Sequence, residues 1–238
     1  MSDRISAVLF DLDGTLLRIE VEAFFPDYFS RLASHLAGYI PPPEFTPRLM
    51  KATHAMINDR DPFRTNREVF MEDFFAGLDH SQETLLPVFD AFYRDEFPKL
   101  STHATPAEGA REAVEAVMAQ GRRVVVATAP VFPRAAIDER LRWAGLQDVA
   151  FALVTSYENM HFCKPHPEYY DEIARQLGCR PSECLMVGND VEEDLAAADA
   201  GMLTFLAGPE IIHRGKRPMA PHYRGTLEDL SALLESLG

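Results

Sequence analysis

The sequence has few of the residues that mark secreted or membrane-spanning proteins. It contains 3 cysteines in 238 residues, an odd number without a C-x-x-C pair. We therefore expect reduced thiols in a cytoplasmic protein rather than a disulfide framework. The apolar runs are shorter than the roughly 20 residues of a membrane helix, and the N-terminus lacks the pattern of a signal peptide. We expect neither a membrane span nor an export signal.

Positive charge is also scarce, with 23 lysines and arginines against 37 acidic residues and a net charge of -14. Nucleic-acid phosphates are held by clusters of lysine and arginine, so we expect no nucleic-acid partner. A small phosphorylated substrate stays compatible with this charge, because one pocket can be locally positive in an acidic protein. The hydrophobic content of 47% is ordinary for a globular chain and sufficient for a sizeable core.

Strand and helix patterns alternate through most of the chain. Short apolar runs predict buried strands at 5–10, 123–128, 149–155, 184–188 and 202–207. Amphipathic patterns predict helices at 109–121, 132–146, 167–178 and 192–201, and a last helix at 226–237 that Thr226 and Asp229 begin. This alternation predicts an α/β fold with a doubly wound parallel sheet of Rossmann-like type, covered by helices on both faces.

Residues 17–105 break this rhythm. They hold aromatic-rich helical patterns without a comparable strand run, and Thr65 or Asn66 is expected to begin the third helix. We predict an inserted all-α domain, here called the cap (residues 17–105), and a core made of residues 1–16 and 106–238. Hinges are expected near Leu17 and Thr105.

We expect the aromatic side chains of the cap to form its own hydrophobic core rather than a substrate cage. These are Phe24, Phe25, Phe74 and Phe75. We expect its basic side chains to be solvated helix charges rather than substrate contacts. These are Arg31, Arg48, Lys51, His54, Arg60 and Arg64.

Two carboxylates follow the first predicted strand, in the segment Asp11-Leu12-Asp13-Gly14-Thr15. The carboxyl ends of parallel strands form the edge at which open α/β sheets bind ligands. Gly14 lets the chain turn sharply there. Because two close, buried carboxylates are costly without a proton or a cation, the segment predicts a functional site.

Polar residues end the later strands too. Thr128 could donate a hydrogen bond to an anionic oxygen, and Lys164 could offset the carboxylates and hold a phosphate. Asn189, Asp190 and Asp194 offer the hard oxygen atoms that Mg²⁺ prefers. Each has an ordinary alternative when taken alone: a strand residue, a surface lysine, or a helix N-cap for Asp190. Their placement at successive strand ends predicts one shared site.

These segments resemble the four motifs of the haloacid dehalogenase-like hydrolase superfamily. FDLDGTLL is similar to its first motif, and Thr128, Lys164-Pro165 and the Asp190 to Asp194 segment are similar to the others. The cap lies where members with a small α-helical cap carry theirs. The resemblance implies that Asp11 is a nucleophile that forms an aspartyl-phosphate and that Asp13 is the general acid and base.

The resemblance further implies how the remaining residues act. Thr128 and Lys164 would bind the phosphoryl oxygens, and Mg²⁺ would be held by Asp11, the backbone carbonyl of Asp13, and Asp190. Many relatives have aspartate where this chain has Asn189. We expect Asp190 to take that place, with Asn189 and Asp194 as alternative ligands or neighbouring donors.

Ala129 and Pro130 replace the more polar residues common after the threonine. The backbone amide of Ala129 is therefore a further candidate for binding the phosphate.

These observations together predict a magnesium-dependent phosphatase that acts on a small phosphorylated metabolite as a monomer or homodimer. A phosphomutase of the same fold and a non-catalytic phospho-ligand-binding protein are the alternatives. A dehalogenase is disfavoured, because such relatives lack the second aspartate that is present here as Asp13. A phosphonate-cleaving enzyme would need a cap lysine for a Schiff base, and Lys51 is expected on the surface.

Overall fold

The apolar run that precedes Asp11 forms an inner strand of a parallel sheet. The computed structural model describes residues 4–237. Over these residues six strands are paired in the order β5-β4-β1-β6-β7-β8. Their bounds are β1 Ala7–Phe10, β4 Arg123–Val126, β5 Leu153–Val154, β6 Cys184–Gly188, β7 Leu203–Ala207 and β8 Tyr223–Gly225. Each neighbouring pair is parallel, so β1, β4 and β6 end at one edge of the sheet.

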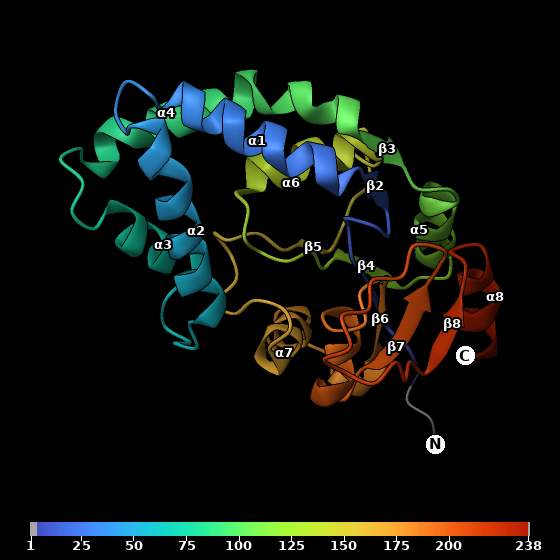
Figure 1. Cartoon of the computed structure of the whole chain (residues 1–238). Coiled ribbons are helices and arrows are strands. Elements are labelled where there is room, and N and C mark those ends of the chain that lie inside the picture. Colours follow the sequence, from blue (N-terminus) through green and yellow to red (C-terminus); the bar gives the residue numbers. More distant parts are fainter. Residues whose placement is uncertain (1–3, 238) are drawn as a thin grey trace.

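Helices cover both faces of this sheet, which confirms the predicted α/β fold (Figure 1). One face carries Val8 and Phe10 of β1 in a cluster with α5, α6 and α8. The opposite face carries Ala7 and Leu9 in a cluster with α7 and the 3₁₀ helix η3. The bounds are α5 Ala110–Ala119, α6 Arg134–Trp143, α7 Pro167–Leu177, η2 Pro181–Glu183, η3 Asp194–Ala200 and α8 Asp229–Ser236. Alternate side chains of one apolar strand thus serve two separate hydrophobic layers.

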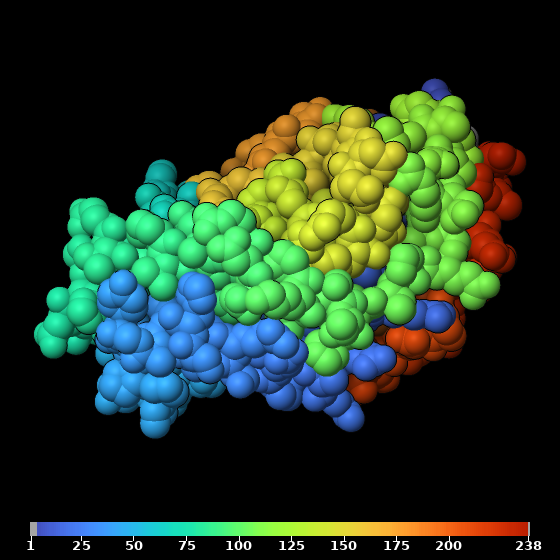
Figure 2. All heavy atoms as spheres, turned by 90° about the horizontal axis from the view of Figure 1, so that it is seen from above, coloured from blue at the N-terminus to red at the C-terminus, as the bar shows by residue number. Residues whose placement is uncertain are grey.

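The helices of the cap pack around an aromatic core of their own. They are α1 Val21–His35, α2 Pro42–Asn58, α3 Asn66–Phe75, α4 Gln82–Asp95 and the 3₁₀ helix η1 Phe97–His103. Phe24 and Phe74 are buried in this cluster, as the sequence predicts, while Phe25 and Phe75 are only partly buried against it. Thr65 caps α3 and forms a capping box with Glu68. Figure 2 shows segments of the cap lying beside α6 of the core.

The chain passes between core and cap through a two-stranded ribbon. Strand β2 (Leu17–Ile19) leaves the core and β3 (Ala104–Pro106) returns to it, and the two pair antiparallel. Leu17 lies opposite Pro106 and Arg18 opposite Thr105. The two positions expected as hinges are therefore hydrogen-bonded neighbours at one place in the fold.

Several elements differ from the sequence predictions. The cap, predicted to be all-α, begins and ends in the short strands β2 and β3. The strand predicted at 149–155 is reduced to Leu153–Val154, because Val149 and Phe151 pack against the hydrophobic core instead of joining the ladder. The segment predicted as an α-helix at 192–201 winds as a 3₁₀ helix over Asp194–Ala200. The sequence analysis did not predict β8, because Tyr-Arg-Gly carries no apolar signature. Within residues 4–237, no helix is both long and apolar enough to span a membrane.

Candidate active site

The side chains of Asp11, Lys164 and Asp194 meet in a buried cluster at the carboxyl edge of the sheet. The Nζ atom of Lys164 donates to Oδ1 of Asp11 at 2.8 Å and to Oδ1 of Asp194 at 2.6 Å. The Lys164 side chain is 0% exposed and that of Asp194 is 1% exposed. Three residues expected at one site from their strand-end positions are therefore in direct contact.

Burial and charge act in opposite directions on this cluster. Burial raises the pKa of Asp11 well above its usual range, and the neighbouring Lys164 offsets only part of that rise. Burial also lowers the pKa of Lys164, but the carboxylates of Asp11 and Asp194 outweigh this effect and raise it overall. Lys164 is therefore a fixed cation between two acids, and it is placed where a phosphoryl group would bring further negative charge.

Two glycines let these side chains approach the backbone. A Cβ atom on Gly188 would lie 2.0 Å from Oδ2 of Asp194, and one on Gly14 would lie 2.3 Å from Nδ2 of Asn189. Gly14 also has a φ of +90°, a conformation that other residues rarely adopt. Close packing inside the site thus requires glycine at both positions, Gly14 and Gly188.

The carboxylate of Asp190 is occupied by partners away from Asp11. Its Oδ1 atom accepts from the backbone amides of Glu192 and Glu193 at 2.9 and 3.0 Å. Arg214 forms two further contacts with it, Nη1 to Oδ1 at 2.9 Å and Nη2 to Oδ2 at 2.7 Å. Asp190 therefore caps the turn that precedes η3, whereas the N-cap residue of η3 itself is Glu193. The sequence analysis did not select Arg214 and missed this pair.

Asn189 lies closer to the turn that follows β1. Its Nδ2 atom donates to the carbonyl of Glu210 at 2.7 Å, which fixes the orientation of the amide. Its Oδ1 atom then lies beside Gly14 and 3.4 Å from the Oγ1 atom of Thr15. The neutral oxygen of Asn189, rather than the carboxylate of Asp190, is the one that faces the Asp11–Thr15 segment.

Asp13 contacts an arginine that sequence reasoning did not select. The Nη1 atom of Arg140 donates to Oδ2 of Asp13. The Arg140 side chain is 1% exposed, and its guanidinium lies 4.1 Å from the centre of the Phe132 ring. Arg140 shares the buried face of α6 with Ala136 and Ile137, so the helical spacing was an available signal for its burial.

Thr128 ends the second predicted strand and is buried at the same edge. Its carbonyl accepts from Oγ1 of Thr155 at 2.9 Å and from the hydroxyl of Tyr169 at 2.8 Å. These bonds fix the backbone that leads into Ala129. The position of Thr128 agrees with a phosphate-binding loop, and its role stays a prediction.

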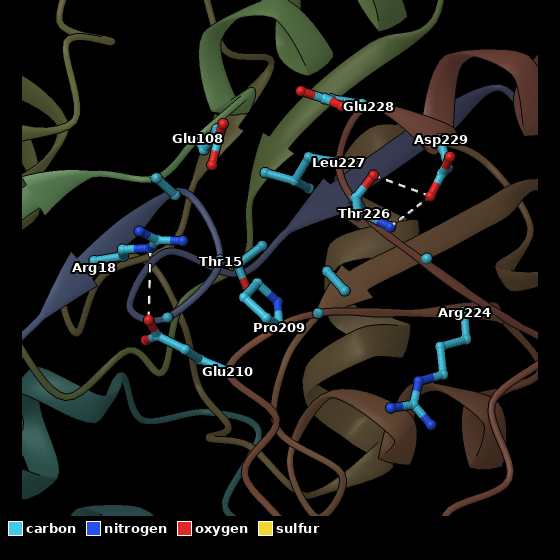
Figure 3. Close-up of a pocket in the computed structure, with 15 residues that line it drawn as sticks. Thr15, Arg18, Glu108, Pro209, Glu210, Arg224, Thr226, Leu227, Glu228 and Asp229 are labelled. Atoms are coloured by element: carbon cyan, nitrogen blue, oxygen red, sulfur yellow. Dashed lines mark hydrogen bonds and ion pairs between the residues drawn. The ribbon is translucent and has the colours of Figure 1, made fainter.

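A hollow of about 460 Å³ lies on the other side of the Gly14–Thr15 turn (Figure 3). Three of its charged side chains have partners within the hollow. Arg18 reaches Glu210 at 3.6 Å, and Thr226 donates twice to Asp229 at 2.8 and 3.0 Å. The walls of this hollow include Gly14 and Thr15 but neither Asp11 nor Lys164, so the hollow is adjacent to the site and does not contain its buried charges.

The oxygen donors of the site are compatible with a magnesium ion that keeps several waters. Over residues 4–237 there is no cluster of three histidine, cysteine or acidic side chains arranged to hold a metal. Mg²⁺ does not need one, since it commonly binds one or two carboxylates, substrate phosphate and water. Asp11, the fixed amide oxygen of Asn189 and the backbone at Asp13 are donors of that kind.

Comparisons with known proteins agree with this arrangement. A family model described as haloacid dehalogenase-like hydrolase matches residues 5–201. Pyrophosphatase PpaX of Bacillus cereus (strain AH820) is 26% identical over 202 residues, covering 84% of this chain and 82% of that protein.

Solved structures share the fold. A HAD phosphatase from Thermococcus onnurineus is similar with a TM-score of 0.57 and 24% identity, covering 96% of this chain and 97% of that chain. L-2-haloacid dehalogenase from Xanthobacter autotrophicus gives a TM-score of 0.57 and 18% identity, covering 98% and 100%. At these identities the likeness concerns the fold alone, because one fold supports different activities.

Proposed function

Because the chain belongs to the haloacid dehalogenase-like hydrolase family, we propose that it is a phosphatase acting on phosphoric monoesters of small metabolites. The observation that carries the proposal is the buried contact of Lys164 with both Asp11 and Asp194 at the strand ends. Phosphoryl transfer to a carboxylate needs a nucleophilic acid, a nearby cation and a second acid that moves the proton. Asp11, Lys164 and Asp13 are groups of these three kinds. The curated relative named above, a pyrophosphatase, supports phosphoryl chemistry in general.

The residues act in two half-reactions. A carboxylate oxygen of Asp11 bonds to phosphorus while the bond from phosphorus to the leaving oxygen breaks, and Asp13 gives that oxygen a proton. Asp13 then takes a proton from water, whose oxygen attacks phosphorus and breaks the bond to Asp11. Inorganic phosphate leaves, the Asp11 carboxylate is free again, and Asp13 returns to the protonated form in which it began. Lys164 offsets the charge on the phosphoryl oxygens, and the Thr128–Ala129 segment orients them.

Asp11, Asn189 and the backbone carbonyl of Asp13 would hold Mg²⁺ in this proposal. The geometry favours Asn189 over Asp190, because Arg214 and two backbone amides already bind the Asp190 carboxylate. The bound ion would neutralise phosphate charge and orient the group for attack. Asp194 acts as a partner of Lys164 and keeps its ammonium directed at Asp11.

Phosphate release from a panel of phosphorylated metabolites with Mg²⁺ tests the proposal. We expect release by the unaltered protein and its loss in Asp11→Asn. Asp171→Asn, the same change at an exposed position on α7, is the matched control and should retain activity. We also expect Asp13→Asn to accumulate a phosphoryl group on the peptide that contains Asp11, detected by mass spectrometry.

The outcomes separate the alternatives. Interconversion of sugar phosphates without net phosphate release would identify a phosphomutase, which uses the same two acids and excludes water. Ligand binding without turnover across the panel would identify a phospho-ligand-binding protein. Equal activity of Asp11→Asn and the unaltered protein would refute the assignment of the nucleophile.

A further inference from the structure

A cavity of about 380 Å³ lies between the cap and the core. Its size is within the range of roughly 300–1,000 Å³ that is usual for small-molecule pockets. The aromatic residues in its walls are Phe25, Tyr28, Phe29, Phe70, Phe89, Tyr93, Phe132 and Tyr157. They come from α1, α3 and α4 of the cap and from the core segments after β4 and β5, so the cavity is complete only when cap and core are together.

The cavity adjoins the catalytic groups through Phe132. The residues Val131 to Pro133 line it and continue directly from the Thr128–Ala129 segment that is proposed to bind phosphate. The ring of Phe132 lies against the guanidinium of Arg140, which in turn contacts Asp13. Phe132 and Arg140 therefore connect the wall of the cavity to Asp13, the residue proposed to serve the leaving oxygen.

The aromatic walls have apolar surface that the protein itself does not cover. Phe25, Phe29 and Phe89 are only partly buried and pack against the edge of the cap core. The hydroxyls of Tyr28 and Tyr93 pair with each other at 3.0 Å, and burial raises the pKa of Tyr28 to about 12. Both phenols are therefore neutral, and this wall offers rings and one hydroxyl pair rather than charge.

The charges around the cavity disfavour an anionic occupant. Asp90 and Glu158 line it and are exposed, so they lie at its solvent side. Arg67 also lines it, so one cation stands against the two carboxylates among these lining residues. A second phosphate, as in pyrophosphate, would meet these two acids and a wall of aromatic rings, and burying it there would be costly.

We propose that this cavity binds the leaving group of the substrate and selects a phosphate monoester of an uncharged alcohol that carries an aromatic or bulky apolar body. This inference rests on the proposed phosphatase function and adds the substrate class. The phosphoryl group would lie at Asp11 in the core, and the organic part would be enclosed by α1, α4 and Phe132. Glycerol-like polar alcohols and pyrophosphate leave the aromatic surface unfilled and are poor substrates.

Monoesters of simple alcohols test this class while the reactivity of the leaving group changes little. We would measure kcat/KM for ethyl phosphate, glycerol 3-phosphate, 2-phenylethyl phosphate and pyrophosphate. One methylene in an apolar pocket changes specificity about 10–200-fold, so 2-phenylethyl phosphate should exceed ethyl phosphate at least tenfold. Pyrophosphate should be the poorest of the four.

Two variants connect this preference to the cavity. Phe89→Ala removes a wall of the cavity and should lower the ratio of phenylethyl to ethyl turnover about tenfold, whereas Phe89→Leu, which keeps apolar contact, should restore most of it. Tyr39→Ala removes an aromatic cap side chain that does not line the cavity, and it should keep the ratio of the unaltered protein. Thermal melting of each variant checks that it folds.

The two possible failures give different results. Ethyl phosphate turnover that depends on Asp11, with no preference for the phenylethyl ester, would overturn the substrate class and leave the phosphatase assignment standing. A pyrophosphate rate above both esters would also overturn it. Absence of turnover for all four compounds, together with unchanged behaviour of Asp11→Asn in the metabolite panel, would reject the phosphatase itself.

Discussion

Arg140 allows a sharp test of the proposed site, because it contacts the site through the side-chain carboxylate of Asp13. Its side chain is 1% exposed, whereas that of Asp13 is 34% exposed. Among residues 4–237, neither Oδ1 of Asp13 nor Nη2 of Arg140 has a hydrogen-bond partner. We infer that Arg140 is a positioning residue that holds one oxygen of Asp13 and leaves the other directed at the site.

We expect Arg140→Met to lower kcat strongly and to leave KM nearly unchanged. Breaking one partner of a fully buried pair costs about 3–5 kcal/mol, but Asp13 is one-third exposed and can be hydrated instead. Met also keeps most of the side-chain volume on Phe132 and relieves a buried charge, so we expect a stability change of about 1 kcal/mol, or 2–4 °C in Tm. General acid–base catalysis is worth about 10²–10⁴-fold, and loss of its orientation should cost about 10²-fold in kcat.

Steady-state kinetics with the substrate found in the panel, together with thermal melting, measure these effects. Arg140→Lys, which keeps the charge but not the planar fork, should recover part of kcat. A normal kcat in Arg140→Met would refute the positioning role. A rise in KM at unchanged kcat would show instead that the guanidinium binds the substrate directly, and a collapse of Tm would show a purely structural residue.

Three further results follow from the same contacts. Because burial raises the pKa of Asp11, the contribution of this carboxyl to stability is lost as pH rises through its folded-state pKa; the Tm of Asp11→Asn relative to that of the unaltered protein in EDTA should therefore rise from about pH 4 to about pH 7, and a relative fall would contradict this. Gly188→Ala places a methyl group 2.0 Å from Oδ2 of Asp194 and should lower both Tm and activity, whereas Gly38→Ala, at a glycine without a positive φ whose added Cβ meets nothing within 4 Å, should leave both unchanged. Arg214→Ala removes one partner of Asp190, whose carboxylate still accepts from two backbone amides. We therefore expect less than tenfold loss of kcat/KM. A loss equal to that of Asp11→Asn would place Asp190 among the metal ligands after all.

Most strands of the sheet and the residues at their ends could be predicted from the sequence, for a physical reason. A buried parallel strand is apolar on both faces, so β1, β4, β6 and β7 stand out as uninterrupted runs. The chain directly after each run must lie at the ligand-binding edge, which made Asp11, Thr128 and Asn189 candidates without knowledge of side-chain contacts.

The residues that sequence reasoning missed act through contacts distant along the chain. Arg140 meets Asp13 across 127 positions, and Arg214 meets Asp190 across 24. Neither lies at a strand end, and a lone arginine is usually a surface residue. The choice of Asn189 over Asp190 as the proposed metal ligand also depends on Arg214. The pattern Gly-Asn-Asp does not indicate which of the two side chains is already bound to another residue.

The cap and the core contribute differently to the proposed reaction, and their contacts show how the site could open. Apart from the β2–β3 ribbon, several contacts hold the cap on the core. The backbone amides of Asn66 and Arg67 donate to the carbonyls of Met160 and Tyr157 at 2.8 and 2.7 Å, and the ring of Phe97 stacks on Trp143. Arg60 also pairs with Glu168, so an open state would have to break these contacts together. The phosphoryl-binding residues all belong to the core and keep their geometry during such a motion. The aromatic cavity has walls from both parts, so the leaving group is recognised only on closure, when chemistry can begin.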